Sequence, residues 1–286
     1  MKLTIYINGR YIQVTSAEFE RLLPGEIKGK GAFETMRMYD GRIFAFADHM
    51  KRLSGGLRHF GIGLPVSRVE ILEIISRLSK INRLRNSRVR IIIWQDKGGK
   101  KISMSLQPLS LPSAAKYRKG YSVMTFALKR RPTRHAHVKS IDYKELRRIS
   151  KEAHRKGFDE ALLLNDQGDV VEGTRTNLFL VKDGTLYTPA LRCGALNGIT
   201  RQKVIVCARG LKVPVRQVRV KPAALLYSDE IFLTGSTLEI MSVTRVDGEK
   251  VGGAIHERSL VRRLQRAYKE MVKREVSICP PQKQLV

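Results

Sequence analysis

Long apolar runs and paired cysteines are both missing from this chain of 286 residues. No apolar stretch approaches the roughly 20 residues that a membrane-spanning helix requires. The first residues enter a strand-like segment, Leu3 to Ile7, rather than a basic region followed by an apolar one. We therefore expect a cytoplasmic protein without a membrane segment. The three cysteines, Cys193, Cys207 and Cys279, lack CxxC spacing and indicate neither a disulfide framework nor a zinc site.

Acidic residues are also scarce. The chain has 26 Asp and Glu against 54 Lys and Arg, which gives a formal net charge of +28. Such a charge attracts polyanions, so nucleic-acid binding is one function class to consider. The basic residues are spread along the chain, with short clusters such as Lys129-Arg130-Arg131, and no zinc-finger or RNA-recognition signature is present. This pattern favours a solvated basic surface with only non-specific attraction to nucleic acid.

The remaining composition is that of a globular protein, with 42% apolar and 28% charged residues. Short strands, tight turns and a few amphipathic helices follow one another, which predicts an α+β fold. The length favours two domains. We place a small N-terminal α/β domain at residues 1–111, a linker rich in Pro, Ser and Ala at 112–118, and a larger β-rich domain with helices at 119–286.

Local signals predict where the elements begin and turn. Asp48 is placed to cap a helix at His49–Phe60, and Ser67 with Glu70 forms a capping-box pattern for a helix that ends near Ile81. Asn-Gly, Asp-Gly and Gln-Gly pairs predict hairpin turns. The other predicted elements are strands at 88–95, 101–106, 122–127, 213–220 and 230–234, helices at 144–156, from 200 and from 256, and turns at 8–9, 40–41, 167–168, 183–184 and 247–248.

Three features indicate chemistry when they are taken together. Lys139 lies in VKSIDYKEL before a predicted helix, and Glu172 ends an apolar strand just before a glycine. Taken alone, Lys139 is typical of an exposed lysine, and Glu172 is typical of a turn residue. The turns Asn197-Gly198-Ile199-Thr200 and Thr234-Gly235-Ser236-Thr237 combine backbone N–H groups with hydroxyls. Such turns suit a phosphate group.

Two long segments carry a family resemblance: GAFETMRMYDGRIFAFADHMKRL and EALLLNDQGDVVEGTRTNLFLVKDGTLYTPALRCGALNGITR. They resemble the N-terminal and central signatures of class IV aminotransferases, which are pyridoxal 5′-phosphate (PLP) enzymes of fold type IV. The resemblance covers residues from about 31 to 245, with the motifs in the expected order. The group includes branched-chain aminotransferases, D-amino acid aminotransferases and aminodeoxychorismate lyases, so the resemblance implies the family more firmly than the substrate.

The resemblance implies a role for each matching residue. PLP would be attached to Lys139, Tyr143 would hydrogen-bond its phenolic oxygen, and Glu172 would face its pyridine nitrogen. A carboxylate there keeps the ring protonated, so that it can accept electrons. Lys139 would also move the substrate proton as general base and acid. The phosphate would be held by Arg52, whose fork matches phosphate geometry, and by Ile199, Thr200, Ser236 and Thr237.

The substrate contacts depart from the branched-chain pattern. Where those enzymes usually have an aromatic residue shortly before the FE pair, this chain has Lys28-Gly29-Lys30-Gly31. Either lysine could meet a substrate carboxylate, or simply be exposed. Arg90 falls where branched-chain enzymes place an arginine toward the active site, and strand alternation leaves open whether it faces solvent. The candidate substrate contacts are Phe33, Lys28 and Arg90.

These features predict a PLP-dependent aminotransferase that moves an amino group from a branched-chain-like or D-amino acid to a 2-oxo acid. The resemblance also implies a homodimer with the cofactor between the two domains, and Tyr143 favours transfer over elimination. An aminodeoxychorismate lyase, which forms 4-aminobenzoate and pyruvate, is the alternative. A basic nucleic-acid-binding protein on an inactive scaffold is a remote one, opposed by intact Lys139, Glu172 and Arg52. No metal is predicted, since the pair His135 and His137 has no third ligand in view.

Overall fold

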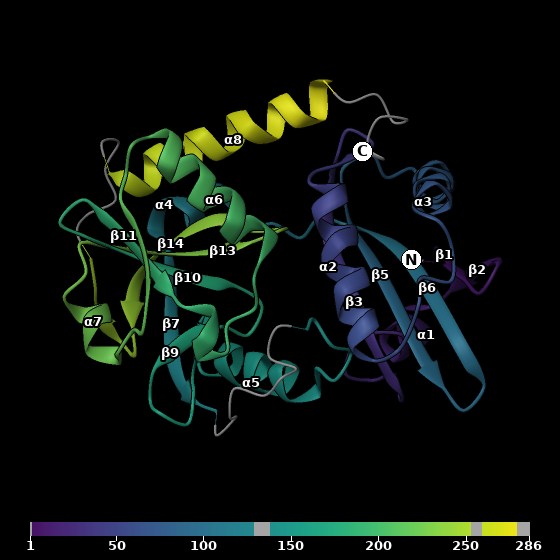
Figure 1. Cartoon of the computed structure of the whole chain (residues 1–286), viewed down its shortest axis with the longest axis horizontal. Helices are drawn as coiled ribbons and strands as arrows, with labels where there is room; N and C mark the ends of the chain where they lie inside the picture. Colours follow the sequence, from purple (N-terminus) through teal and green to yellow (C-terminus); the bar gives the residue numbers. More distant parts are fainter. Residues whose placement is uncertain (1, 129–137, 253–258, 279–286) are drawn as a thin grey trace. The chain divides into compact units, whose positions relative to one another are not determined.

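The computed structural model describes residues 2–128, 138–252 and 259–278 (Figure 1). The chain divides into two compact units. The first comprises residues 1–110, 138–145 and 272–286, and the second comprises 111–137 and 146–271. Each unit contains a β-sheet and helices, so the expected α+β class is confirmed. Within the described ranges, no helix is both long and apolar enough to cross a membrane.

The first unit is built on an antiparallel sheet with the strand order β2-β1-β6-β5-β3-β4. The long central strands β3 and β5 pair over nine residues of each, from Lys30 opposite Gln95 to Met38 opposite Ser87. The elements are β1 (Leu3–Ile7), β2 (Arg10–Val14), α1 (Ser16–Arg21), β3 (Lys30–Tyr39), β4 (Arg42–Ile43), α2 (Phe46–His59), α3 (Arg68–Asn82), β5 (Ser87–Asp96) and β6 (Gly99–Pro108).

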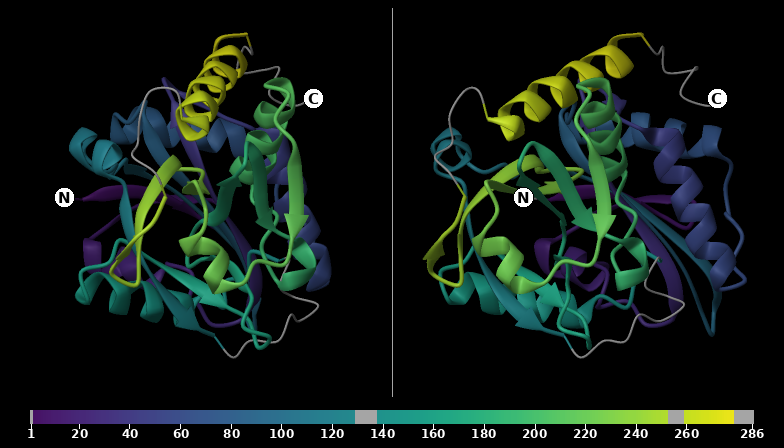
Figure 2. Two further views of the ribbon diagram at one scale, coloured as in Figure 1. Left: turned by 90° about the vertical axis from the view of Figure 1, so that its left-hand side faces the viewer. Right: turned by 60° about the vertical axis from the view of Figure 1, so that its left-hand side comes forward.

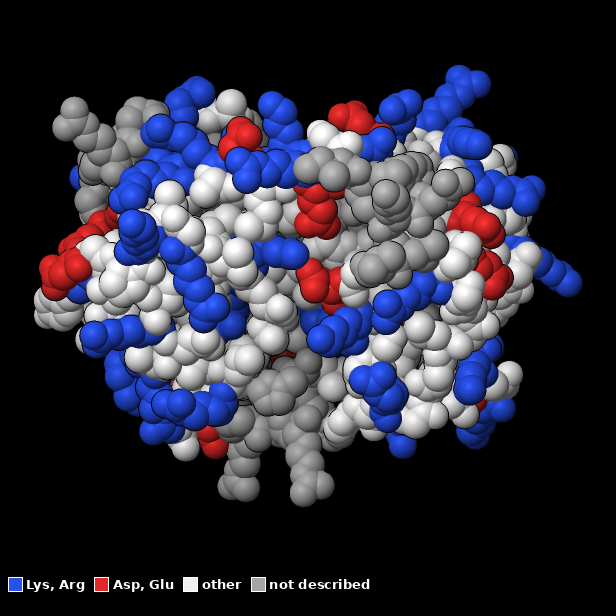
Figure 3. Space-filling model, turned by 45° about the horizontal axis from the view of Figure 1, so that its top comes forward, with Lys and Arg blue, Asp and Glu red and all other residues white. Residues whose placement is uncertain are grey.

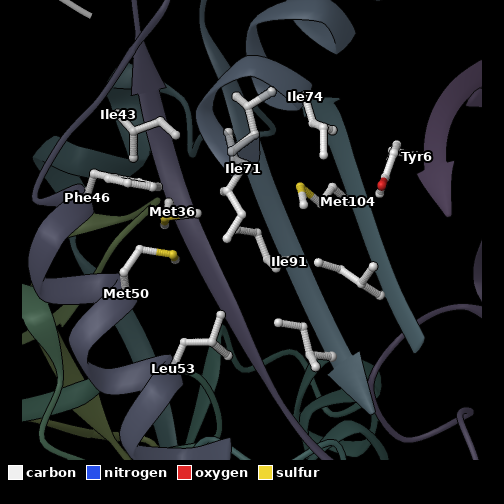
Figure 4. Packing of buried hydrophobic residues seen from close by; sticks show 14 of the residues in the cluster. Tyr6, Met36, Ile43, Phe46, Met50, Leu53, Ile71, Ile74, Ile91 and Met104 are labelled. Carbon is white, nitrogen blue, oxygen red and sulfur yellow. The ribbon is translucent and has the colours of Figure 1, made fainter. Parts of the chain in front are cut away.

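Helices α2 and α3 bury one face of this sheet. Because side chains alternate along a strand, Met36 and Ile91 point to the same side, where Met50 and Leu53 of α2 and Ile71 of α3 pack against them (Figure 4). Each of these side chains is almost completely buried. Burying a side chain of this size contributes about 1.5–3 kcal/mol relative to leaving it exposed. The opposite face of β3 and β5 therefore carries the side chains that remain for other contacts.

The start of α2 differs from the prediction. The helix begins at Phe46 rather than His49, and its N-cap is Ala45 in the left-handed conformation (φ 55°) instead of Asp48. Asp48 lies in the first helical turn. The N–H of Ala45 donates to Glu275 Oε1 at 2.6 Å, so a residue distant in sequence binds this helix start. The sequence signal was therefore wrong by three residues. The second predicted cap is confirmed, because Ser67 Oγ accepts the N–H of Glu70 at 3.1 Å.

The second unit contains a mixed sheet that, over the described residues, has the order β12-β11-β10-β13-β14-β7-β8-β9, with β15 paired to β14. Strand β7 runs parallel to both of its neighbours, β8 and β14. The elements from residue 114 onward are α4 (Ala114–Lys119), β7 (Tyr121–Ala127), α5 (Lys144–Arg155), β8 (Glu160–Leu164), β9 (Val170–Gly173), β10 (Asn177–Lys182), β11 (Thr185–Pro189), η1 (Leu191–Cys193), α6 (Ile199–Gly210), β12 (Val215–Val218), α7 (Pro222–Leu226), β13 (Glu230–Gly235), β14 (Glu239–Val246), β15 (Glu249–Lys250) and α8 (Leu260–Ile278). Residues 144–145 of α5 and 272–278 of α8 group with the first unit.

The two faces of the second sheet have different contents. Leu178 and Leu233 belong to a buried aliphatic cluster on one face. On the other face, the rings of Phe179 and Phe232 stack at 4.9 Å. By alternation, Asn177 and its cross-strand partner Thr234 share the face of these rings. Helix α6 packs against β13. Helix α8 is continuous over its whole length, as both views in Figure 2 show.

The sequence predicted a single boundary between two continuous domains. In the structure, each unit is instead made of more than one segment of the chain. Residues 138–145 and 272–286 group with the first unit rather than with the 119–286 domain. The segment expected as a linker at 112–118 holds most of helix α4, whose N-cap Ser113 accepts the N–H of Lys116. The pairing of residues 139–141 with β3 explains why this segment belongs to the first unit. The expected terminal helix is present as α8, while its predicted start at residue 256 lies outside the described residues.

Candidate functional site

Lys139 lies on a short extended segment that adds to the edge of β3. The N–H of Phe33 donates to Lys139 O at 2.9 Å, and the N–H of Ile141 donates to Gly31 O at 3.1 Å. Gly31 allows a close approach on the other side, where a Cβ atom would lie 2.2 Å from Ile93 O. This pairing fixes the backbone of Lys139 against the long strand of the first unit.

The Lys139 side chain lies beside an aromatic cluster. Its Nζ lies 4.7 Å from the centre of the Phe33 ring. The Tyr143 ring meets Phe33 edge to face, with 5.4 Å between the ring centres. Ile92 and Trp94 pack in the same cluster. The lysine nitrogen therefore lies against the Phe33 ring, which in turn contacts Tyr143.

A buried charged cluster joins β3 to α2 in the same unit. Glu34 is fully buried, and it accepts hydrogen bonds from Arg52 Nε at 2.6 Å and from Arg52 Nη2 at 2.7 Å. His49 Nδ1 lies 2.8 Å from Glu34 Oε2. His49 and Arg52 are three residues apart on α2 and therefore share a face of the helix. Sequence reasoning found Arg52 and missed Glu34 and His49.

The cluster sets the charges of its members. Burial alone would raise the pKa of Glu34, but the charge of Arg52 and the hydrogen bonds outweigh it and lower that pKa to about 2. Burial lowers the pKa of His49, against the opposing effect of the Glu34 carboxylate. Glu34 is thus an anion that only accepts hydrogen bonds, so His49 Nδ1 carries the proton that it donates.

In the second unit, Glu172 lies near the end of β9 and is half-buried. Its Oε2 accepts from Asn177 Nδ2 and from the N–H of Leu196, each at 3.0 Å. Asn177 Nδ2 also donates to Leu196 O at 2.8 Å. These bonds tie the carboxylate to the loop that leads into α6.

Helix α6 begins directly after that loop. Its N-cap is Gly198, which offers no side-chain acceptor, and Ile199 and Thr200 of the first turn are buried. A Cβ atom on Gly198 would lie 2.0 Å from Asn177 Oδ1, so a larger residue would displace the asparagine that holds Glu172. A helix start without a side-chain cap leaves N–H groups for an anion. The chemistry of this end of α6 therefore fits a phosphate.

The buried Arg201 follows in the same turn. Its Nη2 donates to Gln217 Oε1 at 2.8 Å. Burial lowers the pKa of this guanidinium, and the nearby Glu172 carboxylate opposes that shift. The second predicted phosphate turn is the connection between β13 and β14, where Ser236 and Thr237 are half-buried. Next to it, Thr234 Oγ1 is buried without a hydrogen-bond partner among the described residues.

A second buried carboxylate shapes the segment after Glu172. Glu160 accepts from the N–H and Oγ1 of Thr174, at 3.2 and 2.6 Å, and from the N–H of Arg175 at 3.3 Å. Gly173 gives this arrangement room, because a Cβ atom there would lie 2.2 Å from Thr176 Oγ1. Glu160 was not singled out from the sequence, since its position at the start of β8 gives no local signal.

The three candidate substrate contacts have different surroundings. Phe33 is buried in the aromatic cluster beside Lys139. Arg90 is half-buried, and strand alternation places it on the same face as Ile92 of that cluster. Lys28, like the neighbouring Lys30, is exposed. The structure thus groups two of the three candidates on one sheet face of the first unit.

The predicted residues fall into two sets, one in each unit. Lys139, Tyr143, Arg52, Phe33 and Arg90 belong to the first unit, and the second unit holds Glu172, Ile199, Thr200, Ser236 and Thr237. An amine, a carboxylate, an arginine fork and an uncapped helix start are the groups that a phosphorylated pyridine aldehyde requires. The donor set therefore fits PLP. His135 and His137 lie outside the described residues, and no cluster of three metal-ligating side chains occurs within them.

Comparison with known proteins places the chain in a family. Residues 31–246 match the model of "Amino-transferase class IV". Aminodeoxychorismate lyase from Bacillus subtilis (strain 168) is 32% identical, with 94% of each chain covered. The crystal structure of the branched-chain amino acid aminotransferase of Escherichia coli has a TM-score of 0.83 and 26% identity, with 95% of each chain covered.

The branched-chain amino acid aminotransferase of T.th., complexed with N-(5′-phosphopyridoxyl)-L-glutamate, has a TM-score of 0.82 and 26% identity. The alignment covers 96% of this chain and 95% of that one. Both structural matches extend over nearly the whole chain, so the fold is that of fold type IV. The chain belongs to the class IV aminotransferase family of PLP-dependent enzymes.

Proposed function

We propose that this chain binds PLP through Lys139 and transfers the amino group of an amino acid to a 2-oxo acid. The observation that carries the proposal is the position of Lys139. Its backbone is paired with β3, and its Nζ lies 4.7 Å from the centre of the Phe33 ring. Phe33 belongs to one cluster with Tyr143. Family membership supports PLP as the cofactor, because this is a family of PLP-dependent enzymes.

The other proposed roles follow from the chemistry of the side chains. When bound, PLP supplies an electron-accepting ring for the negative charge that develops as a proton leaves the substrate Cα. Glu172, held by Asn177 and Leu196, keeps the ring nitrogen protonated. Lys139 moves the proton, and Tyr143 donates to the phenolic oxygen. The phosphate is held by Arg52, Ile199, Thr200, Ser236 and Thr237.

For the substrate, we propose a branched-chain-like or D-amino acid, with 2-oxoglutarate as the usual acceptor. Phe33 offers an apolar contact and Arg90 a cation for a carboxylate, both on the sheet face that carries the cluster of Tyr143. The relative from T.th. was crystallised with a phosphopyridoxyl derivative of glutamate, which fits this acceptor. A homodimer and a cytoplasmic location stay predictions.

A second candidate is aminodeoxychorismate lyase activity. It is favoured by the 32% identity, over 94% of both chains, to the Bacillus subtilis enzyme of that name. Lys139 would again remove a proton, and elimination would then release pyruvate and 4-aminobenzoate. The same set of cofactor contacts would serve both reactions, so the two must be separated by their products.

A single-turnover experiment tests the proposal. The PLP-loaded protein is given individual L- or D-amino acids without an acceptor, and 2-oxo acid is quantified. An aminotransferase releases one equivalent per site and stops, because the amino group stays on the enzyme. A lyase given aminodeoxychorismate continues to release pyruvate, since elimination needs no acceptor. Continued pyruvate release without amino-acid conversion would replace our first proposal by the second.

The cofactor assignment has its own measurement. We expect the wild-type protein to be yellow after incubation with PLP, because a lysine-linked cofactor absorbs visible light. Lys139→Ala should bind PLP without that absorbance band. A wild-type protein that stays colourless would contradict PLP binding through Lys139.

A further inference from the structure

We infer that Glu34 is a positioning residue for phosphate binding: it fixes the guanidinium of Arg52 in one orientation, with His49 holding the carboxylate from the other side. This inference rests on the proposed function, in which Arg52 binds the PLP phosphate. All three residues lie in the first unit, on β3 and α2.

The geometry determines the orientation of the arginine. Glu34 Oε1 accepts from Arg52 Nε and Oε2 accepts from Arg52 Nη2, at 2.6 and 2.7 Å. Two parallel bonds along one edge of a planar guanidinium define both its position and its plane. His49 Nδ1, at 2.8 Å from Oε2, prevents the carboxylate from rotating about its own axis. The Nε–Nη2 edge of Arg52 is therefore committed to Glu34, and the rest of the fork has a fixed direction.

Stability alone does not explain why a glutamate is kept at this position. Ala32, Met36 and Met38 are its neighbours on the buried face of β3, and all are almost fully buried in the core. Removing a carboxylate from water is costly, and replacement of a buried ion pair by apolar side chains is often neutral or stabilising. A role in orienting Arg52 gives the buried charge a function.

The cluster is also electrostatically connected to the proposed cofactor lysine. The positive charge of Lys139 is one of the causes that lower the pKa of His49. Gly56 of α2 lies against the segment of Lys139, because a Cβ atom on it would be 3.2 Å from Val138 Cγ1. Arg52 would hold the phosphate of the cofactor and Lys139 would bind its aldehyde carbon, and both residues lie on segments that pack against each other within this unit.

A glutamine at position 34 cannot reproduce this arrangement. The carboxylate accepts from Arg52 Nε, Arg52 Nη2 and His49 Nδ1. A glutamine amide has one accepting oxygen, and its NH₂ group is a donor. At least one of the three donors would then face another donor. Glu34→Gln should therefore release Arg52 from its fixed orientation while nearly preserving side-chain volume.

The experiment compares the affinity for PLP with that for pyridoxal, which has the same ring and aldehyde but no phosphate. We expect Glu34→Gln to weaken PLP binding by about tenfold or more, as expected for the loss of a charge-assisted hydrogen bond. Pyridoxal binding should change little, so the preference for PLP over pyridoxal falls. In an Arg52→Leu background, Glu34→Gln should produce no additional change in this preference, because Glu34 acts through Arg52.

Leu53→Ala is the matched control. Leu53 is the next residue on α2 and is buried in the core (Figure 4), so its truncation destabilises the same helix without touching the charged cluster. We expect it to lower the melting temperature and leave the preference for PLP unchanged. If Glu34→Gln does not fold, Glu34→Asp provides the same measurement, because it keeps the charge but withdraws the carboxylate from Arg52 by one carbon. The preference should again fall.

The outcomes separate this inference from the proposed function. A wild-type protein that prefers PLP, with an unchanged preference in Glu34→Gln or in Glu34→Asp, would overturn the role of Glu34 alone. A preference that falls equally in Leu53→Ala would also overturn it, because general destabilisation would then be the cause. A wild-type protein that binds neither compound would overturn the proposed function and this inference with it.

Discussion

At the scale of single residues, Glu172 combines a structural and a proposed chemical task. Its Oε2 accepts from Asn177 and from Leu196, and a glutamine oxygen in that place could accept the same two bonds. We therefore expect Glu172→Gln to keep the fold and the bound cofactor, while the rate of proton removal falls by orders of magnitude because the ring nitrogen loses its charged partner.

Measurement of kcat beside the melting temperature tests this expectation. Unfolding of the variant with unchanged turnover per folded molecule would make Glu172 a turn residue only. The half-reaction with a single amino acid isolates the proton-transfer step from product release.

Acid stability depends on another single residue, Glu34. Its pKa in the folded protein is about 2, well below the ordinary value of 4.5. As the pH falls below 4.5, Glu34 becomes protonated in the unfolded chain while it stays ionised in the folded protein. The contribution of Glu34 is therefore fully present above that pH and is lost progressively as the pH falls to about 2.

The stability difference between wild type and Glu34→Gln should therefore shrink as the pH falls through this window. Urea unfolding of both proteins at neutral pH and at several acidic pH values measures it, and other carboxylates cancel in the difference. A difference that is the same at all pH values would mean that Glu34 titrates alike in both states.

At the scale of elements, the last turns of α8 hold the start of α2. Glu275 Oε1 accepts the N–H of the buried Ala45, and Arg42 Nη1 donates to Ser277 O at 3.1 Å. Glu275→Ala would leave a buried N–H without its acceptor, which costs about 1–3 kcal/mol.

Glu270→Ala is the control for this prediction, since Glu270 is exposed on the same helix and such substitutions usually change stability by less than about 0.5 kcal/mol. Equal free energies of unfolding for the two variants would show that the contact contributes nothing. Chemical denaturation monitored through Trp94, the single tryptophan, suits both measurements.

The same contact explains where sequence reasoning about the elements reached its limit. Hairpin turns follow from local chemistry, and the positive φ values of Asn8 (45°), Asp40 (47°), Asp183 (47°) and Asp247 (50°), each before a glycine, confirm them. The start of α2 does not follow from local chemistry, because its N-cap conformation depends on Glu275, 230 residues away. Asp48 satisfied the local rule and was still the wrong residue.

The candidate site shows a similar division. Arg52 and Glu172 could be proposed from the sequence because they lie in the two long segments that carry the family resemblance, and Lys139 because it lies in VKSIDYKEL between them. Glu34 was visible in principle, since it interrupts an apolar strand face between Ala32 and Met36, but its partners come from a helix 15 and 18 residues later. Glu160, at the start of β8, accepts hydrogen bonds from residues 174–176, which follow β9. Such contacts can be predicted only when the pairing of the strands is known.

At the scale of the whole molecule, several of the few acidic side chains bind backbone N–H groups. Asp159 accepts the N–H of Ser122, Asp247 that of Thr125, and Glu230 that of Leu260. Carboxylates bound in this way stabilise turns and helix starts. Basic side chains meanwhile cover much of the face drawn in Figure 3. On α8 alone the exposed ones are Arg263, Arg266, Lys269, Lys273 and Arg274.

This distribution predicts a particular kind of polyanion binding. Lys and Arg side chains that are distributed over the surface attract the phosphates of any nucleic acid. The affinity for DNA or RNA should therefore be weak and independent of sequence. It should fall steeply between low and physiological salt, because the release of counterions then contributes less. Salt weakens the electrostatic steering of an anionic substrate, so kcat/KM should fall modestly as the salt concentration rises. The value of kcat should stay constant, because steering affects only the encounter and not the bound complex.

Fluorescence anisotropy with short duplexes of different sequence, over a series of salt concentrations, measures the first effect, and steady-state kinetics in the same buffers measures the second. Replacing the five exposed cations of α8 by glutamine should reduce the salt dependence in proportion to the charges removed, with little effect on the choice of sequence. Tight binding to one sequence that survives about 0.15 M salt would contradict this account. If neutralising Lys129, Arg130 and Arg131 abolished such binding, the basic cluster that they form would carry a specific binding role beside catalysis, because diffuse attraction cannot distinguish one sequence from another.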